Sequence, residues 1–221
     1  LPRLFGFGGN LFGSDGRPVL NSKEAVFALD NYKESMKYAC PIPENAWWKT
    51  SVNNFINGNA AMMIMFINHA SDIVNIEKSK VAGMIGYTQV PGNSPLIGGG
   101  SLGISRNSSN IDCAYDFIEW ACGEGISVPF TLLGGVSPCL SVYRNYELME
   151  MVPWLHSAMY GFSIGRRREM WESNGRIVEE HKFEQTLGIS IKSAVLGAIT
   201  SKDAMAHAQQ GVEDLIDQQN T

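Results

Sequence analysis

The chain has 221 residues, of which 44% are apolar and 18% charged, and a formal net charge of −5. These proportions are typical of a globular protein and exclude a disordered or low-complexity chain. They also argue against a nucleic-acid partner, because neutralising phosphates takes a concentrated basic surface and the basic run is limited to Arg166, Arg167 and Arg168. The longest apolar run, at 60–67, is far shorter than the roughly 20 residues that span a bilayer, so we interpret it as a buried strand.

The first segment, 4–22, is rich in glycine and aromatic residues and holds a Ser-Asp-Gly turn. This composition predicts a short hairpin or a loop. Asn21 or Ser22 then caps a helix in which apolar residues recur at spacings of three and four, until Pro41 ends it. The sequence therefore predicts one amphipathic helix directly after the opening hairpin or loop.

Two strands and two further helical segments follow. A short helix is predicted to begin at Thr50 or Ser51 and to end at Gly58, and the strand 61–66 follows it. A polar, weakly helical segment at 68–80 leads to a second strand at 84–90. Helices that alternate with strands in this way predict an α/β fold.

Three glycines at 98–100 precede another predicted strand at 102–105. Ser109 and Asp112 have the spacing of a capping box, which predicts the start of a helix. That helix would place apolar residues on one face, and they are Ile111, Ala114, Phe117, Ile118 and Ala121. Glycines between extended and helical segments are typical of a chain that crosses between two bodies.

The last third of the chain is predicted to be almost wholly helical. A long helical span lies near 178–199, and Thr200 with Asp203 caps a final helix. The predicted core positions of the final helix are Ala204, Ala208, Val212 and Leu215.

The sequence nominates no metal site, cofactor or catalytic group. Its four cysteines (Cys40, Cys113, Cys122 and Cys139) form no C-x-x-C pair and share no ligand spacing with a histidine, so we interpret them as small buried thiols. No nucleophile elbow, phosphate-binding loop or zinc-protease motif occurs. An enzyme is therefore not expected.

Aromatic and small polar residues at the ends of predicted elements suggest a binding site instead. Trp47 and Trp48 lie in a loop, Phe66 and Asn68 end a strand, and Trp171 lies in the loop "GRRREMWESNG". Aromatic faces stack on the apolar faces of sugar rings, and amides bond the hydroxyls, so this set suits a neutral polar ligand. Core or rim packing is the alternative for each aromatic taken alone.

Five motifs in order resemble the extracellular solute-binding proteins of ABC importers, of the sugar-binding type related to maltose-binding protein. They are "DGRPVLNSKEAVFALDNYKESM", "FINGNAAMMIMF", "VPGNSPLIGGGSLGISRNSSNIDCAYDFIEWAC", "GGVSPCLSVYRNYEL" and "AVLGAITSKDAMAHA". The resemblance implies a periplasmic-binding-protein-like α/β fold, mainly the C-terminal lobe, with a helix-rich C-terminal third. It also implies that the chain corresponds to the C-terminal half of such a protein.

The resemblance implies a division into lobes as well. Residues 1–98 and 148–221 would belong to the C-terminal lobe, and 99–147 would belong to the N-terminal lobe. The glycines near 98–100 would then form a crossing between the lobes, beside the ligand.

The function implied by the resemblance is the capture of a sugar or oligosaccharide between two lobes, which close around it, and its delivery to membrane permease subunits. Phe66 and Asn68 match the positions of a stacking aromatic and its polar partner, and Gly99, Gly100 and Ser101 fall at the crossing. The location implied is the periplasm or the outer face of the cytoplasmic membrane. A helical protein-interaction module without a small-molecule ligand is the alternative from another class.

Overall fold

The computed structural model describes residues 1–41, 47–168 and 178–219. The chain forms two compact units. Unit 1 comprises Leu1–Tyr38, Val90–Gly98 and Ile164–Thr221, and unit 2 comprises Ala39–Gln89 and Gly99–Ser163. The backbone passes between the units four times, once between Gly98 and Gly99. Compactness does not identify the lobes of a longer protein, so the lobe assignment of 1–98, 99–147 and 148–221 stays a prediction.

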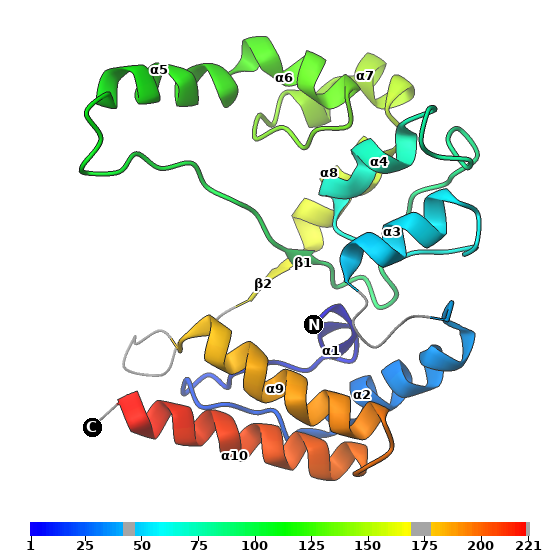
Figure 1. Ribbon diagram of the computed structural model, residues 1–221, viewed down its shortest axis with the longest axis vertical. Coiled ribbons are helices and arrows are strands. Elements are labelled where there is room, and N and C mark those ends of the chain that lie inside the picture. The colour runs from blue at the N-terminus through cyan, green and yellow to red at the C-terminus, as the bar shows by residue number, and fades with distance from the viewer. Residues whose placement is uncertain (42–46, 169–177, 220–221) are drawn as a thin grey trace. The chain divides into compact units, whose positions relative to one another are not determined.

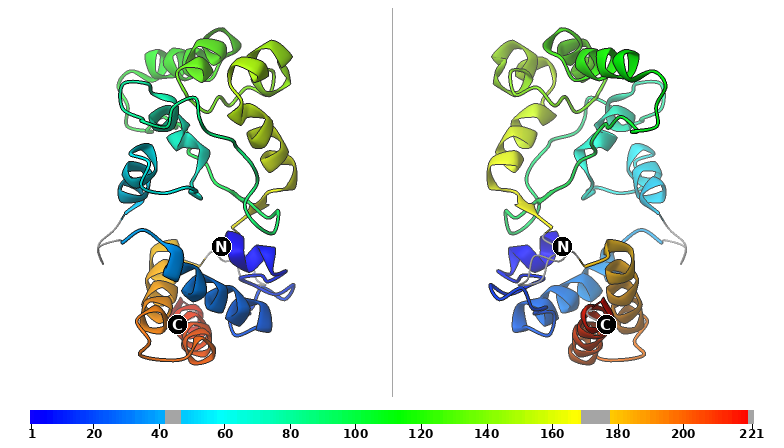
Figure 2. Two further views of the ribbon diagram at one scale, coloured as in Figure 1. Left: turned by 90° about the vertical axis from the view of Figure 1, so that its right-hand side faces the viewer. Right: turned by 90° about the vertical axis from the view of Figure 1, so that its left-hand side faces the viewer.

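The centre of unit 1 is a pair of helices, α9 (Glu180–Val195) and α10 (Ser201–Gln219), which lie side by side in Figures 1 and 2. Ala204, Ala208 and Val212 are fully buried, and their small side chains let the helices approach closely. Thr200 Oγ1 accepts a hydrogen bond from the backbone N–H of Asp203 at 3.1 Å, so the predicted cap is present. The predicted cap and three of the four predicted core positions of the final helix are confirmed, whereas Leu215 is half-buried.

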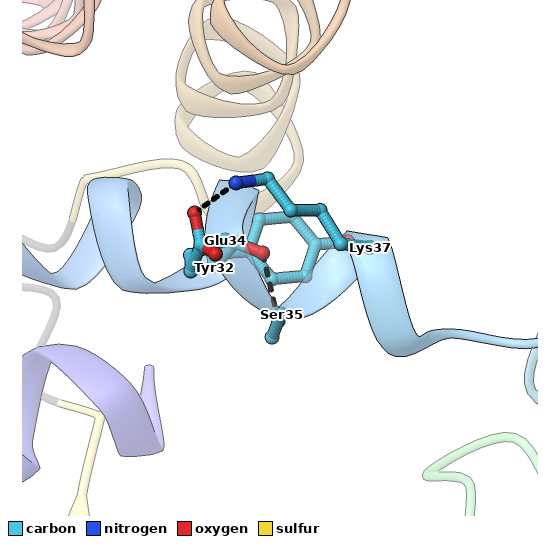
Figure 3. Close-up of polar contacts among 4 residues, drawn as sticks. All are labelled: Tyr32, Glu34, Ser35 and Lys37. Atoms are coloured by element: carbon cyan, nitrogen blue, oxygen red, sulfur yellow. Dashed lines mark hydrogen bonds and ion pairs between the residues drawn. The ribbon is translucent and has the colours of Figure 1, made fainter.

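Helix α2 (Lys23–Ser35) also begins where the sequence predicts it. Ser22 Oγ accepts a hydrogen bond from the backbone N–H of Ala25 at 3.3 Å, which satisfies one of the free donors of the first turn. At the other end, Ser35 Oγ donates to the carbonyl of Tyr32 at 2.7 Å (Figure 3). Lys37 and Glu34 form an exposed ion pair at 2.6 Å, which contributes little because water screens it.

The opening segment contains the predicted hairpin, and a short helix that was not predicted precedes it. Helix α1 (Pro2–Gly6) is followed by an antiparallel bridge between Phe12 and Pro18. Gln209 of α10 holds this hairpin, since its Oε1 accepts from the N–H of Leu20 at 2.7 Å. Its Nε2 donates to the carbonyl of Pro18, also at 2.7 Å.

Within the described residues, the named strands are limited to β1 (Leu96–Ile97) and β2 (Arg166–Arg167) of unit 1, which pair in parallel. A close backbone contact lies just before β1. Gly92 has φ +86°, and a Cβ there would lie 2.6 Å from the Cα of Gly6. Only glycine fits this turn, because a side chain would be strained and would also clash with backbone.

Unit 2 consists of short helices around two apolar clusters. The helices are α3 (Trp48–Ile56), α4 (Ala70–Val74), α5 (Ile111–Ala121), α6 (Glu124–Leu132), α7 (Tyr146–Met151), α8 (Trp154–Ile164) and the 3-10 turns η2 (Ile67–His69) and η3 (Val142–Arg144). The larger cluster is centred on Trp154 and Leu155 of α8, which are almost completely buried. The smaller one joins Val52 and Ile56 of α3 to Ile73 of α4.

The three strands predicted at 61–66, 84–90 and 102–105 are not present. These residues lack helix or ladder, and none of the segments pairs with another part of the described chain. A strand exists only when a neighbour completes its hydrogen bonds, and no local pattern of residues supplies that neighbour. The predicted α/β alternation is therefore reduced to helices and extended segments, with β1 and β2 as its only paired part among the described residues.

Helix α5 differs from its prediction in two ways. Its N-cap is Asn110, and no side chain caps it, so the predicted box of Ser109 and Asp112 does not form. None of its residues is buried, and Cys113 and Cys122 are exposed, while Cys40 and Cys139 are half-buried. The interpretation of the cysteines as buried thiols is thus wrong, because none of the four is fully covered by other parts of the described chain.

Candidate functional site

The two adjacent tryptophans lie at the start of α3. Trp47 is the extended N-cap residue and Trp48 is the first residue of the helix. Trp47 is 71% exposed and Trp48 is 44% exposed. Large aromatic side chains with this much free surface at a helix start are available to a ligand.

Trp48 contacts the turn that carries Phe66 and Asn68. The indole of Trp48 and the imidazole of His69 stack with their ring centroids 4.5 Å apart and their planes tilted by 30°. Phe66 is the N-cap residue of η2 and is 54% exposed, and Asn68 is also exposed. The structure thus places Trp48 beside the turn of residues 66–69. Three of the predicted site residues, Trp48, Phe66 and Asn68, therefore lie in one region, which we call the aromatic region.

His69 is a member of this region that the sequence did not nominate. It is almost buried, and its backbone N–H donates to the carbonyl of Phe66 at 3.2 Å, which closes the turn. Its Nδ1 lies 3.9 Å from Asp72 Oδ2, too far for a hydrogen bond. The sequence offers one weak signal for His69, which is its position three residues after the predicted site residue Phe66.

Gly99, Gly100 and Ser101 are exposed, and none of them forms a hydrogen bond with the aromatic region in the described part of the chain. Neither glycine has a positive φ, and a Cβ at either position would meet no atom within 4 Å. Local sterics therefore do not require glycine here, and a hinge role stays a prediction. The remaining predicted residue, Trp171, lies outside the described residues.

A separate small hollow lies in unit 1, lined by Phe5, Asn10, Leu11, Phe12, Arg166 and Arg167. None of the predicted site residues lines it. The guanidinium of Arg166 sits over the ring of Phe5 at 4.1 Å and donates to the carbonyl of Gly9 at 3.2 Å and to Asn10 Oδ1. These contacts already occupy Arg166, so it is not free to hold an anionic ligand in the hollow.

The described residues contain neither a cluster of metal-binding side chains nor a helix that could span a membrane. Across 1–41, 47–168 and 178–219, no three His, Cys, Asp or Glu side chains gather in a way that would hold a metal ion. Over the same ranges, every helix is too short or too polar to cross a membrane. The aromatic region offers exposed aromatic surface and the amide of Asn68, which can form hydrogen bonds, and both suit the binding of a ligand.

The chain belongs to the bacterial extracellular solute-binding protein family, whose model matches residues 4–126, more than half of the chain. The family's description names its members as extracellular proteins that bind solutes. The predicted resemblance to sugar-type solute-binding proteins of ABC importers is confirmed at the level of the family and the fold.

A curated relative from Sinorhizobium fredii, described as a probable amino-acid ABC transporter periplasmic-binding protein, is 26% identical over 147 residues. That alignment covers 66% of this chain and 34% of the relative.

Two solved structures share the fold. Maltose-bound MalE3 of T. maritima has a TM-score of 0.82 and 23% identity, and the match covers 97% of this chain and 56% of that one. A solute-binding protein of Agrobacterium radiobacter in complex with ribitol has a TM-score of 0.76 and 24% identity, with 97% and 55% covered. The fold is thus that of periplasmic binding proteins, and this chain spans about a third of the curated relative and just over half of the solved chains.

Proposed function

We propose that the chain is part of the substrate-binding component of an ABC importer and that its solute is a sugar or a related polyhydroxylated compound. The observation that carries the proposal is the fold shared with maltose- and ribitol-bound proteins, over 97% of this chain in each case. Exposed Trp47, Trp48 and Phe66 support it, because aromatic faces bind the C–H faces of sugars. Membership of a solute-binding family does not favour the alternative function, a helical protein-interaction module without a small-molecule ligand.

The mechanism requires no covalent chemistry. The solute is captured by stacking on the aromatic region and by hydrogen bonds from Asn68 and the backbone near Ser101. Closure of two lobes around it then shifts a conformational equilibrium, and the closed form is the one that membrane permease subunits recognise. Gly99 and Gly100 accommodate the change in backbone angles at low cost. The site of action is the periplasm or the outer face of the cytoplasmic membrane.

Binding to this chain alone should be weak, because the chain spans just over half of the solved relatives. A single aromatic stack contributes about 0.5–1.5 kcal/mol beyond area burial, so we expect a Kd on the order of millimolar, equivalent to about −4 kcal/mol. Such an affinity is measurable by NMR, in which the indole N–H signals of the tryptophans report on individual side chains.

The test is a titration with maltose, ribitol and a set of amino acids. We expect saturable shifts of the Trp48 signal with maltose or ribitol and none with amino acids. The variant Trp48→Ala should lose the response, and Trp120→Ala, which removes a comparably exposed indole at 59%, should keep it. Saturable shifts with an amino acid alone would assign the solute class named by the curated relative, and no saturable shift with any of these solutes would refute the site.

A further inference from the structure

Two of the four cysteines lie in contact in unit 2. The Sγ of Cys139 donates a hydrogen bond to the carbonyl oxygen of Cys122 at 3.1 Å, although the two residues are 17 positions apart in the chain. Because a carbonyl oxygen is two covalent bonds from its own Cα, the sulfur of Cys139 lies at most about 6 Å from the Cα of Cys122. Cysteines that form disulfides have Cα atoms about 4.4–6.8 Å apart, so this sulfur is within reach of the Cys122 side chain.

Two further side-chain hydrogen bonds join the same two parts of the chain. Ser137 Oγ donates to Ser127 Oγ at 2.9 Å, and both side chains are almost completely buried. Ser141 Oγ donates to Glu124 Oε2. The end of α5 and the start of α6 are therefore held against the turn that carries Cys139 at three points, which keeps the two cysteines together in the folded chain.

The two thiols differ in exposure. Helix α5 is followed directly by α6 (Figure 1), and Cys122 is the exposed C-cap residue of α5 at this junction. Cys139 is half-buried, and its backbone N–H donates to Ser137 Oγ at 3.0 Å. A reagent in solvent can therefore reach Cys122 first, while Cys139 is fixed beside it as the second thiol.

The geometry does not support the other pairings of the cysteines. Cys113 and Cys122 are nine residues apart along α5, a rise of about 13–14 Å, which is too far for a disulfide. Cys40 donates to the carbonyl of Asn59 at 3.2 Å, so its thiol contacts a different segment. Among the described residues, Cys122 and Cys139 are thus the two cysteines that a hydrogen bond joins.

We propose that Cys122 and Cys139 form an intramolecular disulfide, which ties the end of α5 to the turn before η3. The family's description is extracellular, and disulfides form and persist in extracellular compartments. The inference thus rests on the location given in the proposed function and not on its solute. None of the residues of α5 is buried, so the covalent bond supplies a tertiary connection that packing of this helix does not.

The oxidant is another disulfide, either a small one such as oxidised glutathione or that of a protein. The thiolate of Cys122 attacks one of its sulfur atoms, which forms a mixed disulfide and releases one thiolate. The thiolate of Cys139 then attacks the sulfur of Cys122, which forms the intramolecular bond and releases the second thiolate. The two protein thiols are oxidised, and the reagent is reduced to two thiols, which take up the two protons.

The test equilibrates the reduced chain with equal concentrations of reduced and oxidised glutathione, blocks the remaining thiols and analyses peptides by mass spectrometry. Cleavage after glutamate separates the four cysteines into four different peptides. We expect the peptide 120–124, which carries Cys122, to be linked to the peptide 125–147, which carries Cys139. The other two cysteines should be recovered as blocked thiols.

The stability of the chain gives a second readout. A disulfide that closes a loop of this length should raise the midpoint of thermal unfolding by about 5–10 °C over that of the reduced chain. The variant Cys139→Ser should lose both the linked peptides and this increase. Cys113→Ser, which changes an exposed cysteine of the same helix, is the matched control and should keep both.

Oxidation in urea shows whether the folded contact directs the bond. In the unfolded chain the loop between Cys113 and Cys122 is shorter than the loop between Cys122 and Cys139, so loop closure favours the shorter one. The link between Cys122 and Cys139 should therefore predominate in the folded chain and lose its predominance in urea.

Four results would overturn the proposal. They are the recovery of Cys122 and Cys139 as blocked thiols, a link through Cys40 or Cys113 in place of the expected one, equal unfolding midpoints for the oxidised and reduced chains, and the same predominance in urea. A link between two copies of the chain in place of the intramolecular one counts with the second result. None of these readouts uses a solute, so failure here is distinct from failure of the proposed function.

Discussion

Tyr143 gives a prediction with a sign that changes with pH. It is 3% exposed within the larger cluster of unit 2, and its hydroxyl donates to the carbonyl of Ser137 at 2.7 Å. Its ring meets Phe162 edge-on, with centroids 5.3 Å apart. Burial, with a smaller contribution from Cys139, raises the pKa of Tyr143 to about 12 from its usual 10.

The magnitude follows from this difference in pKa. As the pH rises through 10, the tyrosine of the unfolded chain ionises, whereas the folded one keeps its proton until about pH 12. The ionisation of Tyr143 therefore leaves the free energy of unfolding unchanged below pH 10 and lowers it between pH 10 and 12. One pKa unit is equivalent to about 1.4 kcal/mol, so the loss across that interval is roughly 2–3 kcal/mol.

The perturbation is Tyr143→Phe, which keeps the ring and removes the hydroxyl. It leaves the carbonyl of Ser137 without this donor, at a cost of about 1 kcal/mol near neutral pH. The variant lacks the alkaline loss, however. Its stability should be lower than that of the parent chain near pH 8 and higher near about pH 11.5.

The assay is urea unfolding followed by circular dichroism across this pH range. Tyr146→Phe is the control, since Tyr146 is 81% exposed and lies three residues away in the same unit. Its stability difference from the parent should be small and should not change sign. A constant difference for Tyr143→Phe from about pH 8 to about pH 11.5 would refute the assignment of a raised pKa to this residue.

Two further substitutions, one in each unit, test how the units are held together. Leu155→Ala should lower the free energy of unfolding by about 2–5 kcal/mol, because Leu155 is 0% exposed, whereas Met159→Ala, one turn later and 36% exposed, should cost less than about 1 kcal/mol; urea midpoints compare them. Gln209→Ala should cost about 1–3 kcal/mol because it leaves groups of the opening hairpin unpaired, and Gln210→Ala, which loses one exposed contact with Asp214, should be almost neutral by thermal unfolding.

The elements that the sequence predicted well depend on short-range interactions. The cap of α2 uses Ser22 and a backbone N–H three residues later, and the cap of α10 uses Thr200 and Asp203 in the same way. The apolar period of α10 places Ala204, Ala208 and Val212 in the core, as predicted, and leaves Leu215 half-buried. Each of these features involves residues within one or two turns, so the residues themselves contain the information.

The candidate site was predicted only in part, because its contacts join different elements. Nothing near Trp48 in the sequence indicates that its indole stacks on His69, which lies in a separate turn after an extended segment. The same holds for the exposure of Trp47 and Phe66, which depends on what packs around them. Residue type therefore predicted a set of candidates, and the structure shows that Trp48 and the turn of 66–69 are the ones that lie together.

The wrong strand predictions have the same origin, because a strand also depends on contacts with other elements. Residues 61–66 have the composition of a strand that is buried on both faces, and the prediction of burial at 60–67 assumed two covering layers. The structure supplies one layer, from α3 and α4, and leaves Met62, Ile64 and Phe66 exposed. Residues 61–66 therefore keep the alternation of a strand, with Met63 and Met65 half-buried against these helices, but the described chain gives them no strand ladder.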